Sequence, residues 1–225
     1  MNVVSGQMTG RVWLRVQLLA VFVVGTMGAA PHELGVQEAM PFSCATFAPG
    51  VSEADLVRQF GQDNVRSAPV LGGGAEGEYT PGTVLFPDRP GAKVEILWKD
   101  SQLKQLPSHV WTMSRDSVSP WRTPEGISIG TDLPTLERIN GRPFRLFGFG
   151  FDGSGTVATW SEGRLSVPDS AACRMRLSVD PPAGPMPDSI SRHYREVVGG
   201  REFSSGHPAM QMIRPRVYRL FLEYK

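Results

Sequence analysis

Alternating hydrophobic and polar residues predict several short β-strands along the chain. In residues 92–100, Val94, Ile96 and Trp98 share one face and charged residues occupy the other. With residues 83–86 and the turn between them, this segment is expected to form a β-hairpin. Similar reasoning predicts further strands at residues 109–114, 144–151, 156–160, 163–167, 173–179 and 216–225, and a short strand on either side of Gly199-Gly200 within residues 195–205.

Two other segments have apolar residues at helical spacing. The first lies within residues 49–65, where Ser52 and Asp55 form a capping box at its start. Gly61 is suited to the end of this helix because glycine accepts a positive φ. The segment is too short to be stable alone, so we expect packing against a sheet to hold it.

The second helix is predicted to begin at Asp132, whose carboxylate suits an N-cap. Leu133, Leu136 and Ile139 form its apolar stripe. Gly141 is expected to end the helix, and Pro143 prevents its continuation. Each of these residues has a structural role. The sequence therefore predicts a structural connection between a helix and the following strand here, rather than an active-site loop.

The two helical segments are alike, and each precedes a predicted pair of strands. We interpret them as two helix–hairpin units, at residues 49–115 and 116–180, followed by a proline-rich loop and C-terminal strands at 181–225. Chance similarity between two amphipathic helices is the alternative. The predicted fold class is α+β, with short helices packed on antiparallel sheet.

A motif in the second unit supports this interpretation. Its matching residues are Gly126, Ile127, Gly130, Leu136, Gly141 and Pro143. The motif resembles the repeat of small envelope proteins with the β-lactamase-inhibitor-like architecture, a group that includes the small outer-membrane assembly lipoproteins. The resemblance implies a helix-on-sheet fold that works by binding proteins. The chain lacks a lipobox, so the family's partners are not carried over. More broadly it resembles uncharacterised exported proteobacterial proteins, which implies no activity.

The N-terminus has the pattern of an export signal. Residues 1–30 contain Arg11 and Arg15, then an apolar stretch that ends in small residues. The stretch is short for a membrane span, which needs ~20 apolar residues. We predict a signal peptide at 1–30, a leader at 31–48 and a periplasmic or secreted protein. An uncleaved anchor is the alternative, and we expect membrane contact only through one of these two.

The chain has two cysteines, Cys44 and Cys173. In an exported protein they are expected to form a disulfide. Two buried thiols are the alternative. Neither cysteine lies in a CxxC motif or beside a histidine, which argues against a catalytic thiol.

The charge and the polar residues exclude several functions. The formal net charge of +1 offers no field for nucleic acid. No histidine or cysteine spacing suits zinc, so no metal or cofactor is expected. Ser205 and His207 share one loop, and Trp121 follows a Ser-Pro pair and is expected to be exposed. These three are the candidate binding residues.

The favoured hypothesis is a non-enzymatic binding protein whose partner is a protein or an envelope component. One alternative is a carrier with an enclosed apolar pocket for a small ligand. The other is an envelope-acting hydrolase that uses scattered carboxylates or the Ser205/His207 loop. An exposed sheet bearing aromatic residues would support the binding protein.

Overall fold

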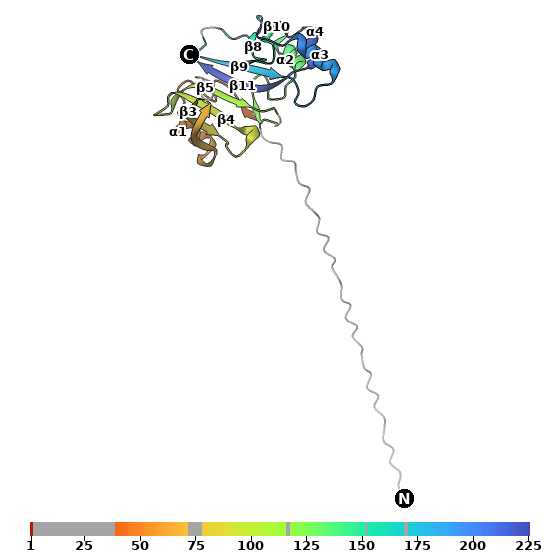
Figure 1. Ribbon diagram of the computed structural model, residues 1–225. Helices are drawn as coiled ribbons and strands as arrows, with labels where there is room; N and C mark the ends of the chain where they lie inside the picture. Colours follow the sequence, from red (N-terminus) through yellow and green to blue (C-terminus); the bar gives the residue numbers. More distant parts are fainter. Residues whose placement is uncertain (2–38, 72–77, 116–117, 152, 169–170) are drawn as a thin grey trace. The chain divides into compact units, whose positions relative to one another are not determined.

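The structure is a computed structural model that describes residues Met1, 39–71, 78–115, 118–151, 153–168 and 171–225 (Figure 1). Contacts divide the chain after Val36, and the second unit, Gln37–Lys225, contains the described helices and strands. The predicted signal peptide and the first part of the leader lie outside the described residues. Within the described part of the chain, no helix is long and apolar enough to cross a bilayer.

The second unit is built mainly from β-strands. The described strands are β1 (Met40–Pro41), β2 (Val65–Leu71), β3 (Tyr79–Leu85), β4 (Val94–Asp100), β5 (Gln105–Met113), β6 (Trp121–Arg122), β7 (Arg145–Phe147), β8 (Val157–Thr159), β9 (Cys173–Asp180), β10 (Glu202–Ser204) and β11 (Arg216–Tyr224). They form a six-stranded antiparallel sheet in the order β2-β3-β4-β5-β11-β9, a three-stranded sheet in the order β10-β7-β8, and the parallel pair β1-β6.

Helices are few and short. The described helices are α1 (Glu53–Phe60), α2 (Leu133–Asn140), α3 (Asp188–Glu196) and α4 (Pro208–Ile213), with 3-10 turns η1 (Gln62–Asn64) and η2 (Pro90–Ala92). The predicted α+β class of helices packed on a sheet is therefore wrong, and the fold is β-rich. The helical patterns span only two turns each, whereas the alternating patterns account for most of the described regular structure.

The two predicted helices have the end structures that their sequences indicate. Ser52 caps α1 by accepting a hydrogen bond from the Asp55 N–H, and the Asp55 carboxylate accepts one from the Ser52 N–H (2.9 Å). Asp132 caps α2 through the Thr135 N–H (3.0 Å). Gly141 ends α2 in the left-handed region at φ 82°, and β7 begins four residues later, after Pro143.

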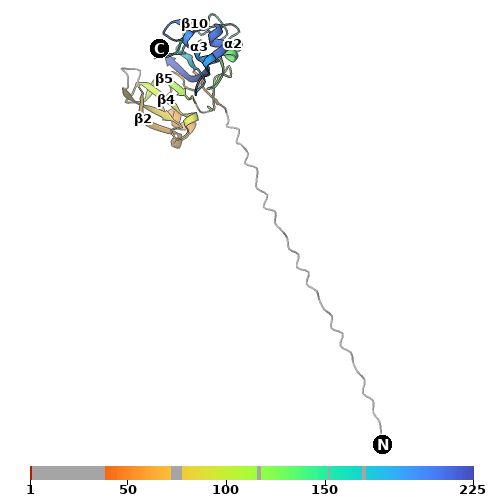
Figure 2. The same ribbon diagram turned by 45° about the vertical axis from the view of Figure 1, so that its right-hand side comes forward.

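The two helices lead into different sheets. The chain from α1 continues into β2, β3, β4 and β5 of the six-stranded sheet, whereas the chain from α2 continues into β7 and β8 of the three-stranded sheet. Figure 1 shows α1 beside β3 and β4, and Figures 1 and 2 show α2 and α3 gathered near β10. An antiparallel strand pair follows each helix, β2–β3 after α1 and β7–β8 after α2, and the two pairs belong to separate sheets.

Some predicted strands are wrong. Residues 163–167 form turns rather than a strand, because Leu165 is fixed by the Asn140 side chain instead of a neighbouring strand (3.2 Å). In the 195–205 segment, residues 195–196 end α3, and one short strand, β10, begins only after the double glycine. In β11, a bulge between Val217 and Arg219 turns Tyr218 away from the face of Leu220, although strict alternation would place both on one face.

The core lies on one side of the six-stranded sheet, which we call the inner face. Ile96, Val110 and Leu220 of this face are fully buried. Helix α1 lies against the same face, since the Glu53 carboxylate accepts hydrogen bonds from Ser67 of β2 (3.0 Å) and from Thr83 of β3. The opposite face of the sheet is partly exposed, with Trp111 and Phe221 half-buried.

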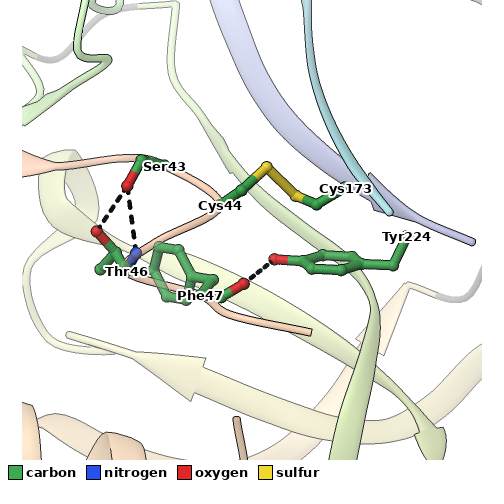
Figure 3. Close-up of a disulfide and its surroundings, with 6 residues drawn as sticks. All are labelled: Ser43, Cys44, Thr46, Phe47, Cys173 and Tyr224. Carbon is green, nitrogen blue, oxygen red and sulfur yellow. Dashed lines mark hydrogen bonds between the residues drawn. A yellow bond between two sulfur atoms is a disulfide. The ribbon is translucent and has the colours of Figure 1, made fainter. Parts of the chain in front are cut away.

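The segment before α1 is part of this core. Strand β1 pairs with β6, and the rings of Phe42 and Phe47 are fully buried against Trp121. Cys44 and Cys173 form a disulfide with a Cα–Cα distance of 5.9 Å (Figure 3), so this expectation is confirmed. The bond fastens the segment to the first residue of β9. Its presence fits a protein that folds in an oxidising, non-cytoplasmic compartment.

Candidate functional site

Trp121 is fully buried, so the expectation that it is exposed is wrong. Its indole N–H donates to the Ala92 carbonyl (2.8 Å), and its ring contacts Phe60 and Phe86 in addition to the rings of the N-terminal segment. The pairing of β6 with β1 draws this residue into the core. Trp121 therefore stabilises the fold and offers no surface to a partner.

Hydrogen bonds within the protein occupy the Ser205 hydroxyl and the Nδ1 atom of His207. The buried Ser205 hydroxyl accepts from the Phe144 N–H (2.9 Å) and donates to the Glu137 carboxylate (2.5 Å). His207 Nδ1 accepts from the Ala209 N–H (3.2 Å) at the start of α4. The two side chains hold a turn in place, and the serine proton is directed at a carboxylate rather than at a histidine base.

The pKa shifts also occur at structural positions. Hydrogen bonds from Ser52 lower the pKa of Asp55, and those from Thr135 lower the pKa of Asp132, because both carboxylates are held in their charged form at helix caps. Burial raises the pKa of Tyr224, which donates to the Phe47 carbonyl (Figure 3). Among the described residues, no group of three or more His, Cys, Asp or Glu side chains could hold a metal ion.

The outer face of the six-stranded sheet, opposite the inner face, brings together residues from four strands. Cross-strand pairing places Glu95, Trp111, Phe221 and Arg176 in one row across β4, β5, β11 and β9. A second row contains Leu97, His109, Glu223 and Arg174, and a third contains Met113, Arg219 and Ser178. We define the outer face by these eleven residues.

Aromatic rings and arginines pack against one another on the outer face. The guanidinium carbons of Arg219 and Arg176 lie 4.8 Å and 5.9 Å from the centroid of the Phe221 ring. Arg176 also pairs with Glu223 (3.3 Å), and Arg219 donates to Ser178 (3.3 Å). These cation–π contacts and hydrogen bonds fix the orientation of both arginines.

The outer face is accessible to a partner in its central part. Trp111 and Phe221 are half-buried, and Met113 is 45% exposed. The Trp111 side chain also packs against a small apolar cluster of Val70, Val84 and Leu97. The rings are therefore held rigidly by the sheet and still present part of their surface to solvent.

Two open grooves flank β9. The larger has a volume of about 660 Å³ and lies between β8 and β9; its lining includes Trp160, Val167, Arg174, Met175 and Arg176. The smaller, of about 220 Å³, lies at the other end of β9. There Arg115 pairs with Asp180 (2.6 Å) and stacks on Tyr218, so the protein's own groups occupy its polar surface.

The sequence contains a signal for the outer face that the candidate residues above do not include. In residues 216–225 the tyrosines and leucines suggest one buried face. Arg219, Phe221 and Glu223 alternate with them and therefore belong to the opposite face of the strand. In residues 109–113, His109, Trp111 and Met113 likewise occupy alternate positions and share one face of the strand. The signal for this surface is therefore that aromatic residues occupy the strand face directed away from the core.

Searches with protein-family models, against curated proteins and against solved structures find no match for this chain.

Proposed function

We propose that the protein is an exported, non-enzymatic binding protein that recognises a protein partner through the outer face of its six-stranded sheet. The observation that carries the proposal is the row of Trp111, Phe221 and Arg176 on three adjacent strands. Tryptophan, aromatic residues and arginine are enriched at the energetically dominant centres of protein interfaces. The disulfide and the N-terminal sequence pattern support export to the periplasm.

Rigidity of the surface favours this role. Arg176 and Arg219 already hold their positions against Phe221, so binding would order few additional side-chain rotamers. Each rotamer-rich side chain that must be immobilised costs about 0.5–1.5 kcal/mol on association. A preorganised row therefore retains more of its contact energy as affinity.

The charges of the outer face favour a partner with an acidic region. Arg174, Arg176 and Arg219 lie on β9 and β11, where Glu223 is the acidic member of the defined face. Glu95 lies on β4, two strands away from β11. A partner would meet positive charge at the β9 side and aromatic surface toward β5.

The proposal is tested by affinity capture from envelope extract of the producing cells. The variant Met113→Glu places a charge on the outer face, and Met212→Glu places the same charge on α4, where the parent residue is 51% exposed. We expect Met113→Glu to lose a captured protein that the parent and Met212→Glu retain. Equal capture by all three would contradict the proposal. Retention after protease treatment of the extract would identify a non-protein envelope component instead.

A further inference from the structure

We propose that the groove between β8 and β9 binds an extended peptide segment with acidic side chains, which pairs with β9 as a further strand of the six-stranded sheet. The inference rests on the proposed function, because the peptide would belong to the protein partner. It adds a binding mode and a sequence preference that the outer face alone does not specify.

Strand β9 is an edge strand of the six-stranded sheet. It has eight residues and ends the strand order of its sheet, so one side of its backbone faces away from β11. Strand β8 is the edge of the three-stranded sheet, and both edges line the same groove. Exposed edges present unpaired backbone groups that can accept an additional strand.

The two edges meet at only one end of the groove. Thr156 and Ser178 form an isolated bridge, and their hydroxyls lie 2.9 Å apart. The Val179 N–H donates to the Gly155 carbonyl across this edge (2.9 Å). The bridge closes the groove near Val179, and Arg174, Met175 and Arg176 are the β9 residues that line its open volume.

The direction of each backbone group on β9 follows from its two ends. The Ala172 carbonyl accepts a hydrogen bond from the Lys225 N–H, so the backbone N–H and C=O groups of even-numbered residues point toward β11. The Val179 N–H points across the edge instead. Because backbone groups alternate in direction along a strand, the N–H and C=O groups of odd-numbered residues point toward the groove. Met175 therefore presents its N–H and C=O to the groove.

Charge gives the peptide its chemistry. Arg174 and Arg176 line the groove from β9, and Glu162 is the one acidic residue among the lining residues. The two arginines are two residues apart on the same face, a spacing of roughly 7 Å. An added strand repeats its side chains at the same interval, so acidic residues at alternate positions would lie beside both arginines. The contact would extend the existing Arg176–Glu223 pair.

The test measures the affinity of the exported, oxidised protein for two fluorescent ten-residue peptides by polarisation. Both peptides alternate Thr and Val; one carries Asp at two alternate positions, and the other carries Lys there. We expect the Asp peptide to bind at least about tenfold more tightly, as a difference of ~1.4 kcal/mol between paired and opposed charges would give. Equal binding of the two, or no binding of either, would overturn the inference.

Two variants distinguish strand addition from simple charge attraction. Met175→Pro removes an N–H that faces the groove and none that pairs with β11, so the fold should persist while peptide affinity falls about tenfold or more. Arg174→Pro removes an N–H that pairs with β11 and should lower the melting temperature instead. Unchanged peptide affinity in a folded Met175→Pro protein would refute strand addition.

A charge variant completes the test. Arg176→Glu should reverse the preference between the two peptides, whereas Arg66→Glu, on the opposite edge strand β2, should not. Sedimentation of the protein alone checks whether a second copy occupies the edge; a β9-dependent dimer would contradict the peptide assignment. If peptide binding fails while capture still depends on Met113, the inference falls and the proposed function stands.

Discussion

At the scale of single residues, the buried Asn140 side chain makes three hydrogen bonds to backbone groups outside α2. The Asn140 side chain donates to the carbonyls of Arg142 (2.9 Å) and Trp160 (3.0 Å) and accepts from the Leu165 N–H (3.2 Å). It thereby fixes the chain after α2 to the loop that follows β8. Asn140, the last residue of α2, therefore also joins two separate segments of the chain.

Asp132 allows a residue-scale prediction of pH dependence. Its folded pKa is lowered by the Thr135 hydrogen bond and then by Arg214, so its contribution is present above its unfolded pKa and is lost as pH falls through the folded value. Asp132→Ala should lower the free energy of unfolding by about 1 kcal/mol at pH 7. Urea denaturation should show a smaller difference from the parent at pH 3.

Asp132→Asn is the matched control, because asparagine also caps helices but carries no charge. It should cost less than alanine at pH 7. A difference between the parent and Asp132→Ala that stays constant from pH 7 to pH 3 would show that the carboxylate charge contributes nothing.

At the scale of elements, the three-stranded sheet meets the six-stranded sheet at Gly155. This residue has φ 67°, and a Cβ added to it would lie 1.8 Å from the Val179 carbonyl oxygen. Only glycine permits the two backbones to approach so closely. The joint between the sheets, and with it the closed end of the groove, depends on this position.

Gly155→Ala should lower the free energy of unfolding by about 3 kcal/mol or more, because both the positive φ and the collision must be relieved. Gly153→Ala is the control: its φ is 77°, but an added Cβ meets nothing within 4 Å. It should cost only about 1 kcal/mol. Chemical denaturation measures both. Equal losses would show that the contact with β9 is unimportant.

The elements that the sequence predicts correctly are those with a local signal. Capping residues and glycine define both eight-residue helices, and alternation defines β4, β9 and β11. Strand β2 is not predicted because Pro69 interrupts its pattern, although proline is tolerated there on a sheet edge. The exposure expected of Trp121 is wrong because its burial depends on Phe42 and Phe47, about eighty residues earlier in the chain, and no local pattern contains that contact.

At the scale of the whole molecule, the disulfide connects the start of the second unit to the β9 edge. It closes a loop of 129 residues. A loop of this length is worth about 5 kcal/mol on the chain-entropy model. Reduction should therefore destabilise the entire unit rather than only the segment near Cys44.

The double variant Cys44→Ser/Cys173→Ser should lower the free energy of unfolding by about 3–5 kcal/mol. Guanidinium denaturation of the parent with and without reductant should give the same difference, and the double variant should not respond to reductant. A parent protein that is insensitive to reductant would contradict a stabilising role for the bond.

Contact between the outer face and a protein partner can be detected by site-specific photo-crosslinking in cells that export the protein. A photoreactive phenylalanine analogue is placed at Met113 on the outer face or at Met212 on α4, two positions of similar exposure. We expect a crosslinked protein at position 113 that is absent at position 212. Crosslinks at position 212 alone, or at neither position, would contradict it.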